Sequence, residues 1–226
     1  RLGTQITNCR FIDNHLTNNS QSTAYFSGKI RINNCIFAGN SVTDRGIAGF
    51  TLAGGENYAD RQGMASNCLV TGNYAHAGQG CGGVEVKGHS RLYNCIIWGN
   101  DGSDEEVQWY HPWGNSLWDG QTGNYGSTEI VSCVIQGLDD GTFGYLNSAA
   151  VVTDCFDADP LLMNPWGDDG IIGTEDDDYR LGEGSPCIDR GNNDLVLIDA
   201  ADLDGDGDYF EPLPLDYNYS WRFMDV

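Results

Sequence analysis

Short runs that alternate between apolar and polar residues recur along the chain, each around a cysteine. An apolar residue stands three positions before the cysteine and another stands two positions after it. Five runs align in this way, and a sixth at 152–155 is degenerate; the five are residues 6–14, 32–40, 65–73, 92–100 and 130–138. Between the cysteines of successive runs the interval varies from 22 residues (Cys133 to Cys155) to 38 residues (Cys95 to Cys133). A fixed motif joined by variable loops predicts a repeat protein of short stacked strands.

Two columns of asparagine accompany the cysteines. The first column directly precedes them and consists of Asn8, Asn34, Asn67 and Asn94. Asparagine tolerates the left-handed backbone of a sharp bend, so this column predicts a corner between two strands. Stacked asparagine side chains hydrogen-bond along a stack of strands, and we expect an asparagine ladder here. The second column, usually preceded by glycine, predicts the next corner; it consists of Asn14, Asn40, Asn73 and Asn100.

The cysteines are expected to point inward as a column of the core. This column consists of Cys9, Cys35, Cys68, Cys95 and Cys133. Free cysteine behaves as a small buried hydrophobe, and stacked parallel side chains do not suit the disulfide dihedral angle, so we expect reduced thiols. The even total of eight cysteines leaves a Cys155 to Cys187 disulfide as the less favoured alternative. Zinc is not expected, because paired Cys-x-x-Cys or histidine spacing is missing.

These columns predict an all-β fold, a parallel β-helix solenoid with variable loops. A helical solenoid would need apolar residues at a spacing of three and four, and the repeats lack this spacing. A β-sandwich also uses short strands, but it does not predict the same cysteine and asparagine columns in each repeat. We expect one domain, with the coils at 1–155 and with terminal coils and an irregular acidic C-terminal cap at 156–226.

The chain resembles the right-handed parallel β-helix repeat proteins of bacterial surfaces. Its coil pattern is similar to that of pectate lyases and polymorphic outer-membrane proteins. The C-terminal part carries the more specific motifs: Asp159-Pro-Leu-Leu, Asp178-Tyr-Arg-Leu and Ser185-Pro-Cys-Ile-Asp-Arg-Gly191, then the Asp-rich run from Asp202 to Asp208. The resemblance implies a secreted, extracellular or cell-surface protein, often very large, with a separate anchoring or export domain. The first repeat begins almost at Arg1, so we expect this chain to be a piece of a longer polypeptide. The resemblance does not imply one activity.

The net charge of the chain limits the classes of partner that it is expected to bind. Lys and Arg number 11 against 33 Asp and Glu, which gives a formal net charge of −22. This charge repels nucleic acid and anionic membranes, so neither is expected as a partner. Apolar runs of the roughly 20 residues that cross a bilayer are missing as well. Only Arg180 and Arg190 interrupt the acidic segment from Asp154 to Asp208, which favours hard cations over ion pairs.

Two acidic loops are candidate calcium sites. In the first, carboxylates alternate and a glycine permits the sharp turn; the candidate ligands are Asp202, Asp204, Asp206, Asp208 and Glu211. Position twelve of this loop is Leu213 where an EF-hand has glutamate, so Glu211, or Asp199 from the other side, would complete the site. The candidates in the second loop are Asp168, Asp169, Glu175, Asp176 and Asp178. The alternative for both loops is a solvated acidic turn.

An aromatic-rich insertion follows the fourth repeat, with Trp109, Tyr110, Trp113 and Trp118 as candidate glycan-binding residues. Aromatic rings on a long loop can stack on sugar rings. The alternative, which we favour, is that the insertion buries these rings as a small core of its own.

Catalytic residues do not emerge from the sequence. Basic residues are scattered among different repeats, and the carboxylates cluster in loops of the metal-binding kind. We therefore expect a non-enzymatic extracellular structural or adhesive protein that binds calcium. Its partners would be a second copy stacked end to end into a fibre, or neighbouring domains of a longer chain. The alternative is a polysaccharide-active enzyme, a lyase or a hydrolase, or a glycan-binding module on the same scaffold.

Overall fold

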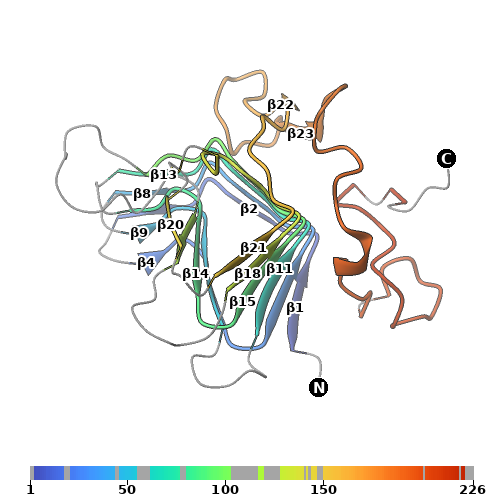
Figure 1. Ribbon diagram of the computed structural model, residues 1–226. Coiled ribbons are helices and arrows are strands. Elements are labelled where there is room, and N and C mark those ends of the chain that lie inside the picture. The colour runs from blue at the N-terminus through green and yellow to red at the C-terminus, as the bar shows by residue number, and fades with distance from the viewer. Residues whose placement is uncertain are drawn as a thin grey trace.

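A computed structural model describes residues 3–17, 21–43, 46–54, 62–76, 80–102, 117–119, 128–139, 141, 144–146, 150–200, 202–218 and 220–221. Across these residues the fold is all-β, and its helical structure is one short 3-10 turn, η1 (Asn193–Leu195). Three larger sheets are built from parallel pairs of strands (Figure 1). The prediction of an all-β fold with parallel strands is confirmed.

Sheet 1 contains β1 (Thr4–Thr7), β6 (Ile30–Asn33), β11 (Gly63–Ser66), β15 (Ser90–Tyr93), β18 (Glu129–Val131) and β21 (Val151–Thr153). Sheet 2 contains β2 (Arg10–Ile12), β7 (Ile36–Ala38), β12 (Leu69–Thr71), β16 (Ile96–Trp98) and β19 (Val134–Ile135). Sheet 3 contains β5 (Tyr25–Ser27), β10 (Phe50–Ala53), β14 (Val84–Lys87), β17 (Leu117–Asp119) and β20 (Gly144–Tyr145). The chain visits the sheets in a recurring order, from sheet 1 to sheet 2 to sheet 3.

Smaller sheets complete the described fold. One joins β3 (His15–Leu16), β8 (Ser41–Val42) and β13 (Tyr74–Ala75), and another pairs β4 (Gln21–Ser22) with β9 (Gly46–Ile47). The antiparallel pair is β22 (Leu162–Asn164) with β23 (Asp178–Leu181). Helices long and apolar enough to span a membrane are not found among the described residues.

The core lies between the three larger sheets, and its columns are those of the sequence repeats. Ile6 pairs with Ile32 in sheet 1, and Phe11 pairs with Phe37 in sheet 2. The Phe11 and Phe37 rings stack with their centroids 4.7 Å apart and their planes 6° apart. Burial of each such side chain contributes roughly 1.5 to 3 kcal/mol, so repetition along the columns supplies the main driving force for folding.

The first asparagine column forms the corner between sheet 1 and sheet 2. We call it the asparagine corner. Its residues have φ between 51° and 55°, the left-handed region that asparagine tolerates, and they are Asn8, Asn34, Asn67, Asn94, Ser132 and Asp154. The predicted bend is therefore present, and it persists in the two repeats that lack asparagine.

The asparagine ladder lies in the second column instead. Asn14 Nδ2 donates to Asn40 Oδ1 at 2.8 Å, Asn40 Nδ2 to Asn73 Oδ1 at 2.8 Å, and Asn73 Nδ2 to Asn100 Oδ1 at 2.9 Å. The prediction of a ladder in the first column is wrong. Asn8 is the clearest case, because its buried side-chain amide has no hydrogen-bond partner in the described part of the chain.

All eight cysteines are free thiols, Cys155 and Cys187 included. Four of the predicted column, Cys35, Cys68, Cys95 and Cys133, are buried in the core, and Cys9 is half-buried. Cys155 extends the column by one position, since its Sγ accepts the Cys133 N–H at 3.4 Å. Burial raises the pKa of the Cys68 and Cys133 thiols.

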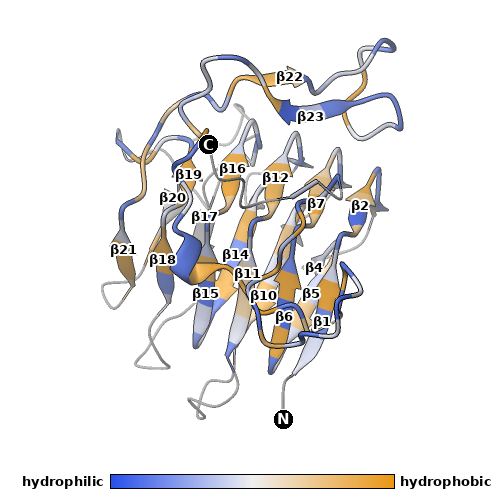
Figure 2. Cartoon of the chain, turned by 90° about the vertical axis from the view of Figure 1, so that its right-hand side faces the viewer, coloured by the Kyte–Doolittle hydropathy of each residue, from blue (hydrophilic) through white to orange (hydrophobic). Residues whose placement is uncertain are grey.

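The C-terminal segment lies along the side of the sheets and does not cap their end (Figures 1 and 2). We call residues 192–200 and 202–218 the C-terminal strap. Asn94 Nδ2 donates to Asn192 O, Ser66 Oγ to Leu195 O, and Gln5 Nε2 to Ile198 O. The strap thus runs back from the fourth repeat to the first. This corrects the predicted C-terminal cap, because the asparagine corner offers hydrogen bonds along the flank of the sheets.

The loop between β22 and β23 packs on sheet 2 through Ile172. A Cβ at Gly72 would meet Ile172 Cδ1 at 2.2 Å, and a Cβ at Gly39 would meet the Ile172 carbonyl at 2.3 Å. Both glycines also have positive φ. Glycine precedes three of the four ladder asparagines, where it permits the turn, and at Gly39 and Gly72 the missing side chain also leaves room for the loop.

Candidate metal centre

The acidic loop between Asp199 and Glu211 is folded by turns of its own backbone. Asp202, Gly205 and Gly207 have φ of 54°, 75° and 88°, which aspartate and glycine accept in tight turns. The Gly207 N–H donates to Asp202 Oδ1 at 3.1 Å, and the Asp206 N–H donates to Asp204 Oδ1 at 3.3 Å. These turns fold the chain so that alternate carboxylates come together.

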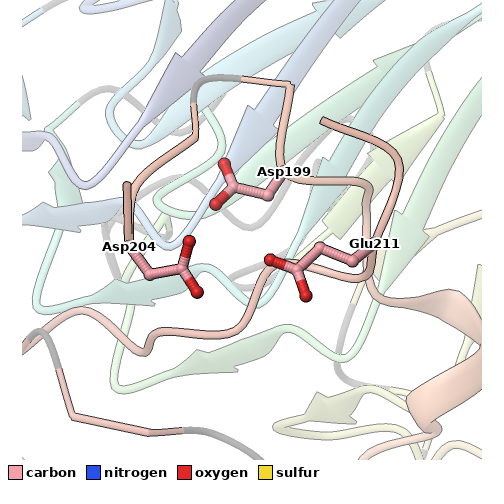
Figure 3. Close-up of side chains that lie close together, drawn as sticks. All are labelled: Asp199, Asp204 and Glu211. Atoms are coloured by element: carbon pink, nitrogen blue, oxygen red, sulfur yellow. The ribbon is translucent and has the colours of Figure 1, made fainter. Parts of the chain in front are cut away.

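Two groups of three carboxylates result, and Asp204 belongs to both. One oxygen each from Asp199, Asp204 and Glu211 lies within 4.8 Å of the other two, and the same holds for Asp202, Asp204 and Asp206. The carboxylates of the first group face one another (Figure 3). The first group joins both ends of the loop, whereas the second is formed by neighbouring residues on one turn.

The first group is the more enclosed. Asp199 is fully buried, its N–H donates to Glu211 O at 2.9 Å, and its Oδ2 accepts the Leu203 N–H at 2.7 Å. Glu211 Oε1 is hidden from solvent and has no hydrogen-bond partner among the residues that the structure describes. Burial, followed by the charges of four nearby aspartates, raises the pKa of the Glu211 carboxyl. A carboxylate in this position is therefore destabilised by its surroundings.

The donor set fits a hard divalent cation. Calcium binds oxygen ligands at 2.3 to 2.6 Å, so ligand oxygens on opposite sides of the ion stand about 5 Å apart. The spacing within each group matches this geometry. A cation would neutralise the mutual repulsion and give Glu211 Oε1 the partner it lacks. Asp199, Asp204 and Glu211 would hold such an ion, with Asp202 and Asp206 close to it.

Asp208 is the predicted ligand of this loop that falls outside both groups. Its Oδ1 accepts the Phe210 N–H at 2.9 Å, and its own N–H donates to Asp206 Oδ1 at 2.7 Å. Leu213 stands at the position where an EF-hand has its glutamate, and its side chain is fully buried. In place of a glutamate at position twelve, the structure places Asp199 and Glu211 in one group with Asp204.

The second acidic loop does not assemble a comparable group among the described residues, and calcium binding by this loop stays a prediction. Among the described residues, the carboxylates at 168, 169, 175, 176 and 178 do not bring three ligand oxygens together. Asp176 instead accepts the Asp168 N–H and the Thr174 hydroxyl, and these hydrogen bonds lower its pKa. Asp178 forms an ion pair with Arg180 at 2.6 Å. These contacts favour the alternative of an acidic turn.

Three of the predicted glycan-binding residues, Trp109, Tyr110 and Trp113, lie outside the described residues. Trp118 belongs to β17, where it pairs with Glu85 of β14. The predicted glycan-binding role of this insertion stays a prediction.

A buried carboxylate on sheet 3 escaped the sequence analysis. The Glu85 side chain is only 5% exposed, its Oε1 lies 2.8 Å from Lys87 Nζ, and its Oε2 accepts the Thr51 hydroxyl at 2.7 Å. Burial raises the pKa of the Glu85 carboxyl, and the Lys87 ammonium and the Thr51 hydroxyl oppose this shift. The run Val84-Glu85-Val86-Lys87 has the pattern of a strand with one solvated face, so the burial had no sequence signal.

Comparison with protein family models, with curated proteins and with solved structures found no match. The assignment of a function therefore depends on the geometry of the chain itself.

Proposed function

We propose that this chain is a right-handed parallel β-helix that acts as an extracellular structural or adhesive surface element, with calcium fastening its C-terminal strap. The recurring visit to three parallel sheets supports the β-helix, because it is what a chain coiling around one core produces. Right-handedness is supported by the near-universal handedness of crossovers between parallel strands. The secreted location is inferred from the resemblance of the repeats and the C-terminal motifs.

The observation that carries the calcium proposal is the enclosed carboxylate group at the base of the strap loop. Asp199 directly follows Ile198, whose carbonyl accepts a hydrogen bond from the side chain of Gln5 in β1. Glu211 precedes Pro212, which forms an isolated antiparallel bridge with Ile198. A cation bound between Asp199 and Glu211 would therefore join the two ends of the loop at the point where the strap contacts the first repeat.

Calcium is expected to raise the melting temperature of the chain. A ligand that binds only the folded state at 100 times its Kd contributes about 2.7 kcal/mol. In a chain of this size that corresponds to a rise on the order of 5 to 10 °C. The measurement is thermal unfolding followed by circular dichroism, in EDTA and in millimolar calcium. Equal melting temperatures in the two solutions would contradict the proposal.

The variant Glu211→Gln separates calcium binding from general charge effects. Its response to calcium should be largely lost. In EDTA it should match or exceed the wild type in stability, since the raised pKa of Glu211 shows that its charged form is disfavoured in the folded state. For the same reason any stability difference in EDTA between Glu211→Gln and the wild type should shrink as the pH falls toward the ordinary glutamate pKa. Asp208→Asn is the matched control, as it removes a charge from the same loop outside both groups and should keep the response.

End-to-end stacking into a fibre stays a prediction. One feature supports it: β21 is an edge strand of sheet 1, and its residues Val151 and Val152 are 51% and 39% exposed. Unpaired edges with exposed apolar residues favour association with another strand. Electron microscopy in millimolar calcium should show filaments longer than one chain, and a uniform population of short particles would count against stacking.

A further inference from the structure

A groove runs along the asparagine corner, beneath the C-terminal segment. Two adjoining cavities of about 270 and 280 Å³ share Asn67 and Leu69 in their linings. A third of about 380 Å³ adjoins the second through Ser132 and Arg190. From Asn34 to Ser132 the groove crosses four neighbouring strands, which is roughly 14 Å at the usual strand spacing. This length corresponds to about four residues of extended polypeptide.

The floor of the groove is aliphatic. It is formed by residues that are neighbours in the register of sheet 2, and they are Ile36, Leu69, Ile96 and Val134. The lining also includes polar side chains of the asparagine corner, together with Tyr179, Leu181 and Cys187 from the C-terminal part of the chain. An occupant must therefore offer both apolar groups and hydrogen-bonding groups along its length.

The strap shows what the asparagine corner binds. At Asn94, the Asn192 N–H donates to the side-chain Oδ1 at 2.8 Å, and the side-chain Nδ2 donates to the Asn192 carbonyl at 3.0 Å. At Asn34, the side-chain Nδ2 donates to the Leu215 carbonyl at 2.9 Å. These asparagines on either side of the groove centre thus recognise the main chain of an extended segment.

Asn67 lies between these two positions and has the same backbone conformation. Its Nδ2 donates to Asn33 Oδ1 at 2.9 Å, which leaves the second hydrogen of that amide for another acceptor. Within the part of the chain that the structure describes, Asn67 Oδ1 accepts no hydrogen bond. Asn67 therefore presents to the groove the donor and acceptor that Asn94 uses on the strap.

We propose that this groove, centred on Asn67 and Leu69, binds an extended peptide that bears aliphatic side chains. Its main-chain amide would pair with Asn67 as Asn192 pairs with Asn94, and its side chains would pack on the aliphatic floor. The strap itself combines main-chain hydrogen bonds to the asparagine corner with buried leucines, Leu197, Leu213 and Leu215.

The chemistry of the walls favours a peptide over a glycan. Sugar rings commonly stack on open aromatic faces, but two of the aromatic rings that line the cavities carry a guanidinium over one face: Arg10 lies 5.7 Å from the Tyr179 centroid, and Arg190 lies 5.0 Å from the Phe156 centroid. The charged side chains that line the three cavities nearly balance, and this suits the uncharged main chain of a peptide. The cationic ones are Arg10, Arg180 and Arg190, and the anionic ones are Asp154, Asp177, Asp178 and Asp189.

The test is fluorescence anisotropy with a capped, fluorescein-labelled peptide of the sequence of residues 192–198, titrated with the full chain in constant calcium. We expect saturable binding. Asn67→Gly should weaken it about tenfold, because two main-chain hydrogen bonds are lost while glycine keeps the positive φ. Asn8→Gly is the matched control in the same column outside the groove, and it should bind within about twofold of the wild type.

Leu69→Thr is a second variant that tests the floor without changing the bend. It should weaken binding about threefold or more through the loss of apolar contact. Absence of binding, or equal affinities for the wild type and both groove variants, would overturn the proposal. Displacement of the peptide by chitotetraose or cellotetraose at comparable concentrations would also overturn it and would assign the groove to a glycan.

Discussion

Replacement of Asn73 by alanine is expected to lower the free energy of unfolding by about 3 kcal/mol. Asn73 is 1% exposed. Its Oδ1 accepts both the backbone N–H and the Nδ2 of Asn40, and its Nδ2 donates to Asn100 Oδ1 and to the Phe37 carbonyl. Alanine would leave the N–H of Asn40 and the carbonyl of Phe37 buried without this partner. Each such group costs roughly 1 to 3 kcal/mol.

Urea unfolding followed by circular dichroism measures this loss. Asn14→Ala is the matched control, because Asn14 ends the same ladder and is exposed to solvent, and its side chain only donates, to Asn40 and Ile12. Water can replace those bonds, so the control should cost less than about 1 kcal/mol. Equal losses in the two variants would mean that the ladder contributes little beyond the turn itself.

The ladder also shows how far the sequence determines the fold. The repeat columns predict the parallel strands, the inward cysteines and the sharp bend at Asn34 and its equivalents, because each depends on a local preference repeated in register. The position of the ladder was not determined in this way. Asn34 and Asn40 belong to columns of equal regularity, and only the backbone path decides which side chain points along the stack and which points outward to the strap.

The candidate metal site was also predicted only in part, because some of its residues have a local sequence signature and others are placed by tertiary packing. Alternating aspartates on a glycine-rich turn have a local signature, so Asp202, Asp204 and Asp206 could be selected. Asp208 fits that signature equally well, yet its carboxylate caps the next turn. Asp199 was open to selection only as an alternative, since its burial depends on the strap packing against β1. The groove at Asn67 has no local signature, because its walls come from segments more than 100 residues apart.

The ion pair between Lys87 and Glu85 on sheet 3 is expected to make the other large contribution to stability. Lys87→Met is expected to lower the free energy of unfolding at pH 7 by about 2 kcal/mol. Loss of one partner from a buried pair costs roughly 3 to 5 kcal/mol, and a smaller value applies here because the Lys87 side chain is 32% exposed. The reason is that Glu85, which is 5% exposed, would keep its charge without the ammonium that offsets its burial.

The pH dependence of this loss identifies Glu85 as its source. The pKa of Glu85 is already raised by burial, and removal of Lys87 should raise it further. A folded-state pKa above the unfolded value means that stability is retained below the unfolded pKa and is lost as the pH rises through the folded one. The deficit of Lys87→Met should therefore shrink as the pH falls from 7 toward about 4.5. The double variant with Glu85→Gln should recover most of the loss at pH 7. The control Lys29→Met changes an exposed lysine between β5 and β6, away from Glu85, and should alter stability by less than about 0.5 kcal/mol at either pH. A deficit that stays constant with pH would show that the Lys87 side chain acts through packing and not through its charge.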